Sequence, residues 1–192
     1  MNKLLIEKIT DCFKATFKTQ PLLIFSPGRI NLIGEHTDYN NGFVFPAAIH
    51  KGIYVAIEKS KTHVSTAIAL DVKSKFEFTT NFLKRFKKGS WKNYLLGVVS
   101  EIKKKGKSIS NFNLVFAGDI PNGAGLSSSA ALENAIVYGL NELFQLGFTK
   151  EEMIFISQKA EHNFVGVQCG IMDNMQVCLA RKTQPFYWIV KS

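Results

Sequence analysis

Apolar positions in the first half of the chain follow helical spacing once and strand spacing afterwards. In residues 3–17 apolar side chains recur every three or four positions, which predicts an amphipathic helix that ends before Pro21. Residues 22–25 form a short apolar run typical of a buried strand, and residues 43–80 alternate in several places, as in a meander of strands. The chain therefore begins with a helix followed by a β-rich segment.

The second half of the chain has helical spacing around one further strand. Residues 91–105 carry aromatic and aliphatic side chains on a single stripe, which predicts a helix that packs in a core. An alternating run at residues 112–116 predicts a strand. Thr149 and Glu152 have the spacing of a capping box, which predicts a helix from there through about Asn163.

A loop rich in glycine and serine, residues 118–129, lies between that strand and a helix predicted by apolar residues 130–143. Gly123 and Gly125 allow a tight turn and a close approach to a ligand, and Ser127 to Ser129 supply N–H groups and hydroxyls where the helix begins. Anions bind at such places. Serine capping is the plainer interpretation, but three consecutive serines exceed what a cap requires.

The spacing of this loop excludes three commoner motifs. Ala124 and Gly125 stand where a Walker A loop requires Lys and Ser or Thr. Ser128 stands where a dinucleotide fingerprint requires its third glycine, and Ser129 where a hydrolase nucleophile elbow requires glycine. A less common phosphate loop remains.

Residues 26–49 are too polar for a core and too ordered for a linker. Glu35, His36 and Asp38 offer two carboxylates and an imidazole, which together can bind several hydroxyls at once, as a sugar requires. A hairpin turn closed by an Asn-Gly pair explains the end of this stretch but not its start. A metal site on the same three residues is less favoured, because adjacent residues of extended backbone point to opposite faces.

A single carboxylate, Asp173, follows a glycine-bearing turn and stands among apolar neighbours. A carboxylate there loses solvation, and it keeps its charge only beside a cationic or hydrogen-bonding group. Arg29 is the candidate partner. A simple helix cap is an equally good interpretation of Asp173.

Composition narrows the class of protein. A chain of 192 residues that is 46% hydrophobic can bury a core and suits one domain, or one domain and part of another. No apolar run reaches the roughly eighteen residues of a membrane span, and three cysteines without a CxxC pair indicate neither a disulfide frame nor a zinc site. We therefore expect a cytoplasmic protein without a membrane partner.

The net charge of +9 suggests nucleic-acid binding as one class of function. The basic clusters, however, stand at the ends of predicted elements, and no pattern of a nucleic-acid-binding module accompanies them. An anionic small substrate gains from the same positive field. We therefore expect no nucleic-acid partner.

Three stretches together resemble the galactokinases, members of the GHMP family of small-molecule kinases. Residues 28–40 look like the galactokinase signature, residues 121–131 like the family's ATP loop, and residues 170–173 like the segment of the catalytic aspartate. The resemblance implies an α+β fold of the GHMP-kinase N-terminal type. In that fold a mixed, mostly antiparallel sheet has helices packed on one face and a left-handed βαβ crossover, an exception to the usual handedness.

The resemblance also implies a reaction, the ATP-dependent phosphorylation of the anomeric hydroxyl of galactose with Mg²⁺. Asp173 would be the base or charge partner at that hydroxyl, and Arg29 would keep Asp173 ionised and stabilise the transferring phosphoryl group. Ser129 and Glu161 would hold Mg²⁺. The sugar would contact Glu35, His36, Thr37, Asp38 and Gly170, and the ATP phosphates would contact Gly123, Ala124, Gly125, Leu126, Ser127, Ser128 and Ser129.

The sequence departs from the family pattern after Asp173. Asn174-Met175-Gln176 stands where the family has Gln and then an aromatic or other apolar residue. No glycine follows Gly170, so the third glycine-rich motif of the family is missing. We therefore expect a truncated product without the C-terminal domain, from a reading-frame change just after Asp173.

The expected organisation has three parts. Residues 1–20 form the N-terminal helix of the same domain, residues 21–180 the sugar- and ATP-binding domain, and residues 181–192 a divergent tail. Loss of a packed half exposes apolar surface, so we expect self-association through that surface. Two alternatives stay open, a non-catalytic module that holds sugar or nucleotide and a kinase for a related sugar such as N-acetylgalactosamine.

Overall fold

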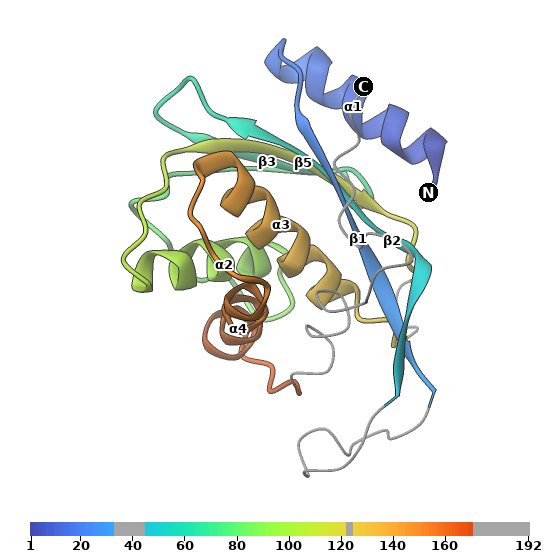
Figure 1. Cartoon of the computed structure of the whole chain (residues 1–192). Helices are drawn as coiled ribbons and strands as arrows, with labels where there is room; N and C mark the ends of the chain where they lie inside the picture. Colours follow the sequence, from blue (N-terminus) through green and yellow to red (C-terminus); the bar gives the residue numbers. More distant parts are fainter. Residues whose placement is uncertain (33–44, 122–124, 171–192) are drawn as a thin grey trace.

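The computed structural model describes residues 1–32, 45–121 and 125–170, which form one twisted sheet between layers of helices (Figure 1). In chain order the elements are α1 (Lys3–Phe17), β1 (Leu22–Asn31), β2 (Pro46–Lys59), β3 (Ser65–Ala69), β4 (Ser74–Phe78), α2 (Lys92–Lys104), β5 (Phe112–Gly118), α3 (Ser128–Phe144), α4 (Lys150–Ala160) and the π-helical turn η1 (Glu161–Val165).

Within the described residues the sheet has five strands in the order β1-β2-β5-β3-β4. Only the pair of β3 and β5 is parallel, and the other described pairs are antiparallel. The α+β class with a mixed, mostly antiparallel sheet is therefore confirmed. The parallel pair is joined through β4 and α2, and the left-handed crossover expected for the family stays a prediction.

The expected meander over residues 43–80 is corrected at one point. β2 and β3 follow each other in the chain, yet β5 lies between them and pairs with both. β5 is buried along almost its whole length, whereas alternate side chains of β4 are exposed. A strand buried on both faces belongs at the centre of a sheet and a half-exposed strand at its edge.

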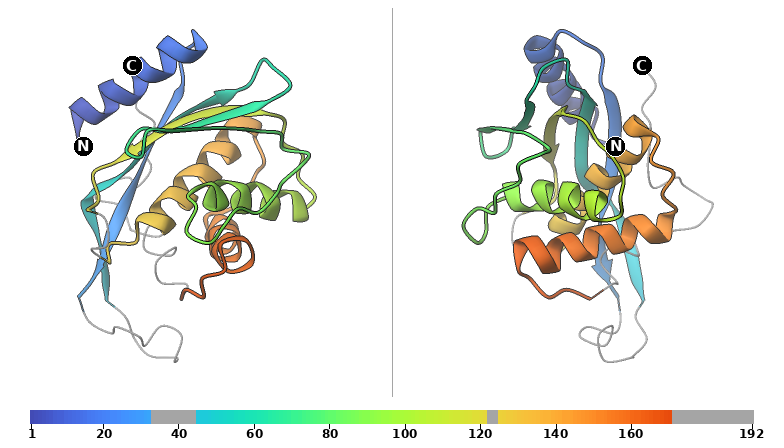
Figure 2. Two further views of the ribbon diagram at one scale, coloured as in Figure 1. Left: turned by 180° about the vertical axis from the view of Figure 1, so that it is seen from behind. Right: turned by 90° about the vertical axis from the view of Figure 1, so that its left-hand side faces the viewer.

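Alternate residues of the central strands enter two separate cores. Val55 and Leu114 pack with α2, α3 and α4, whereas Tyr54 and Val115 pack with Ile9 and the rest of α1. Helices on one face were expected, and this holds for α2 to α4. α1 lies on the opposite face, as the two further views show (Figure 2). An amphipathic helix must bury its apolar stripe, and this face of the sheet is the apolar surface left for it.

The helix ends follow the capping rules. The helix predicted over residues 3–17 is confirmed, with Leu5 N donating to Asn2 Oδ1 at 3.3 Å. The capping box of α4 is confirmed as well, because the Glu152 and Thr149 side chains each accept the other residue's N–H. α4 does not continue to Asn163 as an α-helix, since the chain widens into η1 from Glu161. No helix in the described ranges is long and apolar enough to cross a membrane.

Candidate functional site

The N-terminus of α3 lies just beyond the end of β5, as predicted for the phosphate loop. Ser127 adopts a left-handed conformation with φ of 54°, and in the described part of the chain its side chain makes no capping hydrogen bond. The first intrahelical bond runs from Ala131 N to Ser127 O at 3.0 Å. The N–H groups of Ser128, Ser129 and Ala130, in the first turn of α3, therefore have no acceptor within the helix, and N–H groups in such a position bind anions. The plain capping interpretation does not hold for Ser127.

Arg29 lies beside this loop because β1 is bulged at Gly28. The register of β1 against β2 shifts between Pro27 and Arg29, and Arg29 N donates to Leu126 O at 3.1 Å. A Cβ on Gly28 would lie 2.9 Å from Leu126 O and 3.0 Å from Ile120 Cδ1, so the loop packs directly on the bare backbone. The structure thus brings the buried Arg29 and the predicted phosphate loop together.

A carboxylate that the sequence analysis passed over fixes the base of the loop. Asp119 Oδ1 accepts from Gly52 N at 2.7 Å, and Asp119 N donates to Gly52 O at 3.1 Å. Gly118 N donates to Asp71 Oδ2 at 2.7 Å. Both carboxylates tie the end of β5 to neighbouring backbone and are therefore structural. The sequence offered one sign of these roles, because both aspartates follow strands that are predicted by alternating apolar and polar residues.

Two buried glutamates meet beside the start of α3. Glu161 begins η1, and Glu133 lies on α3 with 0% of its surface exposed. Burial, and secondly the charge of Glu161, raises the pKa of the Glu133 carboxyl well above its ordinary value. Burial also raises the pKa of Tyr94 on α2, with smaller contributions from both glutamates. Glu161 was expected from the family resemblance, whereas Glu133 was not predicted, although an acid within the apolar run of α3 was visible.

Side chains from several elements hold the segment that follows Glu161. Arg85 Nη2 donates to Val165 O at 3.0 Å, and Cys169 N donates to His162 Nε2 at 3.1 Å. Burial first, and then the charge of Glu161, raises the pKa of the Cys169 thiol, which makes it a poor nucleophile. These contacts fix the approach to Gly170, the last residue that the structure describes.

Several predicted site residues lie outside the described residues. Of the predicted site residues, the structure describes Arg29, residues 125–129, Glu161 and Gly170. The signature residues 33–44 lie between β1 and β2 in the chain, and the ends of these two strands are paired at Asn31 and Pro46. The predicted residues outside the described ranges are Glu35, His36, Thr37, Asp38, Gly123, Ala124 and Asp173.

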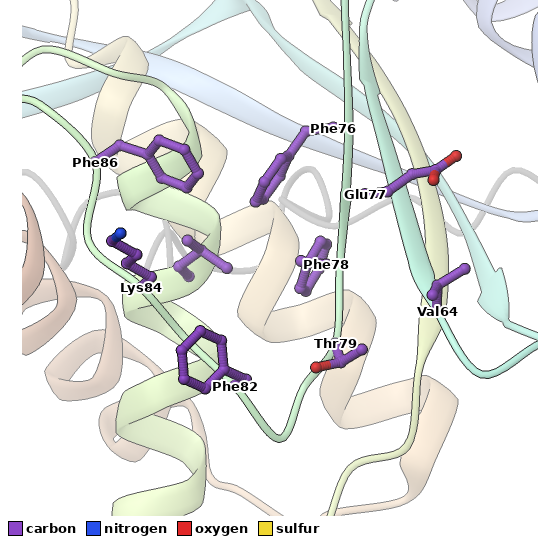
Figure 3. Close-up of a pocket in the computed structure, with 9 residues that line it drawn as sticks. Val64, Phe76, Glu77, Phe78, Thr79, Phe82, Lys84 and Phe86 are labelled. Carbon is purple, nitrogen blue, oxygen red and sulfur yellow. The ribbon is translucent and has the colours of Figure 1, made fainter.

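A cavity of about 380 Å³ lies between β4 and α2, apart from these groups. Four phenylalanine rings face the same space together with the Lys84 side chain (Figure 3). None of the predicted site residues that the structure describes lines this cavity. The predicted chemistry therefore belongs to the loop and bulge region and not to this pocket. The four rings are those of Phe76, Phe78, Phe82 and Phe86.

Comparison with known proteins decides the family. Residues 11–59 match the model of the galactokinase galactose-binding signature, and residues 93–181 match the model of the GHMP kinase N-terminal domain. The chain is 42% identical over 182 residues to the galactokinase of Clostridium acetobutylicum, covering 93% of this chain and 46% of that protein. The chain belongs to the galactokinase family. It is also 44% identical over 159 residues to the galactokinase of Clostridium tetani, covering 82% of this chain and 41% of that protein.

The fold agrees with a solved galactokinase. The structure of Lactococcus lactis galactokinase complexed with galactose matches with a TM-score of 0.83 and 34% identity, over 89% of this chain and 45% of that one. The predicted galactokinase resemblance and the GHMP-kinase N-terminal type of fold are confirmed. The chain spans about half the length of the curated galactokinases it matches. The boundaries at residues 20 and 180 stay predictions.

Proposed function

We propose that the chain carries the sugar- and ATP-binding part of a galactokinase that transfers the γ-phosphoryl group of ATP to the anomeric hydroxyl of galactose. The observation that carries this proposal is the hydrogen bond from Arg29 N to Leu126 O. It joins β1, which lies within the part of the chain that matches the galactose-binding signature, to the loop that precedes α3. A sugar bound by the signature residues and a triphosphate bound by the loop before α3 then meet at the bulge of β1.

At the phosphate end of the site, backbone N–H groups and the Arg29 guanidinium bind negative charge. The N–H groups in the first turn of α3 and the loop residues Gly123 to Ser129 bind the ATP phosphates, because a helix N-terminus favours negative charge. Arg29 is buried beside this loop, where its guanidinium stabilises charge spread over the transferring group. Phosphoryl transfer asks mainly for alignment and neutralisation of charge, which these groups supply.

The sugar end uses hydrogen-bonding side chains. Glu35, His36, Thr37 and Asp38 bind galactose hydroxyls, and Gly170 leaves room beside the ring. Asp173 accepts the proton of the anomeric hydroxyl, or holds that hydroxyl in line, with Arg29 keeping its carboxylate charged. The galactose in the Lactococcus lactis structure supports this substrate class.

The described residues fit a divalent cation. Glu161 is buried and its Oε2 has no hydrogen-bond partner within the described chain, while Ser129 offers a hydroxyl in the first turn of α3. Carboxylate and hydroxyl oxygens are the ligands that Mg²⁺ prefers. Ser129 and Glu161 hold the ion, and when bound it neutralises charge on the ATP phosphates.

Phosphorus NMR of the chain with ATP, Mg²⁺ and a sugar tests the proposal. We expect a galactose 1-phosphate resonance that depends on galactose and is lost in Asp173→Asn. N-acetylgalactosamine in place of galactose tests the related-sugar alternative. ADP formed at the same rate with and without any sugar contradicts the proposal.

A second candidate is a module that binds sugar or nucleotide without turnover. Titration calorimetry separates the two. Galactose and a non-hydrolysable ATP analogue that both bind, with no sugar phosphate formed, support the binding module. A cytoplasmic location and self-association stay predictions, and light scattering of the purified chain tests the second.

A further inference from the structure

Glu133 is an acidic residue on the buried face of α3. It lies between Leu132 and Asn134 on the buried face, and none of its surface is exposed. It follows Ser129 by one helical turn, so the two side chains share a face of the helix. Helical side chains lean toward the helix N-terminus, which aims the Glu133 carboxyl over the turn that holds Ser129.

Both carboxyl oxygens of Glu133 lack a hydrogen-bond partner within the described chain. The adjacent buried Asn134 is different, because its Oδ1 accepts from Ser157 Oγ at 2.9 Å. An unpartnered buried polar group costs about 1–3 kcal/mol, and more when it is charged. Such a group in a native protein requires an explanation, and an ion is one of the recognised ones.

A second buried carboxylate, on another element, lies near enough to act electrostatically on Glu133. Glu161 at the start of η1 is 4% exposed and also has an unpartnered buried oxygen, Oε2. The two glutamates act on each other electrostatically, and both act on Tyr94 of α2. The described residues thus include two buried carboxyls with unpartnered oxygens, one on α3 and one on η1, and the Ser129 hydroxyl one helical turn before Glu133. All three groups offer the hard oxygen ligands that Mg²⁺ prefers.

We propose that Glu133 is a third protein group of the cation site of Ser129 and Glu161, with its carboxylate accepting hydrogen bonds from water bound to the divalent ion. Mg²⁺ usually keeps several waters and takes only one or two protein carboxylates directly. Groups that hold such outer ligands typically change metal affinity by about 10- to 100-fold. This inference rests on the proposed function, since it deepens the same site.

Calorimetric titration with Mn²⁺, in the presence of a non-hydrolysable ATP analogue, tests the inference in the 192-residue chain. We expect Glu133→Gln to bind Mn²⁺ about 10- to 100-fold more weakly than the wild type. Glu133→Met needs no buried hydrogen-bond partner, and the same loss is expected from it. Glu133→Asp keeps the charge and recovers part of the affinity. Glu142→Gln, on an exposed turn of the same helix, leaves the affinity unchanged.

The outcomes separate this inference from the function on which it rests. A wild type that binds Mn²⁺, with the same affinity in Glu133→Gln and Glu133→Met, overturns the role of Glu133 and leaves the proposed function standing. A purely structural role would lower the thermal unfolding midpoint of these variants by the same amount with and without Mn²⁺. A wild type that binds neither nucleotide nor Mn²⁺ overturns the proposed function and the inference together.

Discussion

At the scale of single residues, the close packing of the phosphate loop on β1 explains why a glycine stands at residue 28, which the signature motif alone does not explain. Gly28 belongs to the sugar signature, but its contacts are with the phosphate loop, through Leu126 O and Ile120. The bulge at this glycine then determines the position of Arg29 beside the loop. The absence of a side chain at residue 28 therefore matters as much as the charge at residue 29.

We expect Gly28→Ala to weaken nucleotide binding about tenfold, because the added Cβ pushes Leu126 and the loop off β1 at a cost of about 1–3 kcal/mol. Calorimetry with a non-hydrolysable ATP analogue measures the effect. Gly139→Ala is the matched control, since its Cβ would lie 2.6 Å from Ile24 Cδ1 in the middle of α3. It lowers the free energy of unfolding but leaves nucleotide affinity unchanged. Equal nucleotide affinity in Gly28→Ala and the wild type would contradict this role of Gly28.

The raised pKa of Glu133 gives stability a pH dependence in the cation-free chain. Its ordinary value is 4.5, and burial first and Glu161 second raise it in the folded state, which therefore binds the proton more tightly than the unfolded state. The stability that this tighter proton binding contributes is fully present below pH 4.5, and it is lost as the pH rises through the folded-state pKa of Glu133. Glu133→Gln does not titrate, so we expect it to gain stability relative to the wild type as the pH rises.

Urea unfolding at a series of pH values, with EDTA present, measures that difference. Comparison with the variant removes the titration of other groups, because both chains share them. A difference in unfolding free energy that stays constant from pH 4.5 upward would show that Glu133 ionises normally in the fold.

Residue-level prediction from the sequence depends on local motifs, and the roles assigned to the site residues stay predictions. Arg29 and the serine run stand in motifs, whereas Glu161 was assigned from the family resemblance. The structure brings Arg29 to the loop and Glu161 to the buried acid pair. Glu133 and Asp119 were missed, because their roles depend on a neighbouring element and not on adjacent sequence. A buried acid without a partner cannot be recognised until the packing around it is known.

At the scale of elements, alternation predicted which residues are buried but not which strands pair. The run at β5 was recognised as a strand, yet its place between β2 and β3 depends on pairing across distant segments. The opposite placement of α1 has the same origin, since a helical stripe shows that a face is buried and not against which side of the sheet. Capping patterns are local, and for that reason the capping box at Thr149 was predicted correctly.

Thr149→Ala removes one side of that capping box and is expected to lower the free energy of unfolding by about 1 kcal/mol. Chemical denaturation followed by circular dichroism measures it. Thr16→Ala serves as the control, because the Oγ1 of this exposed threonine donates to Cys12 O within α1 and caps nothing. The control should stay within about 0.5 kcal/mol of the wild type. A loss in the control as large as that in Thr149→Ala would remove the capping explanation.

At the scale of the whole molecule, the proposed site joins parts of the chain that are far apart in sequence. The bulge of β1, the start of α3 and the turn η1 come from three separate stretches, and backbone contacts and buried charges relate them. The net charge of +9 adds a field that favours an anionic nucleotide. The helix α1 and the pocket between β4 and α2 lie outside this arrangement.

Hydrogen–deuterium exchange with and without galactose and a non-hydrolysable ATP analogue tests this arrangement most directly. We expect slower exchange in peptides covering residues 28–38, 123–131 and 161–173, and unchanged exchange in α1 and β4. Protection that appears around the pocket between β4 and α2 instead, or in only one of the three stretches with both ligands bound, would contradict a single site shared by sugar and nucleotide.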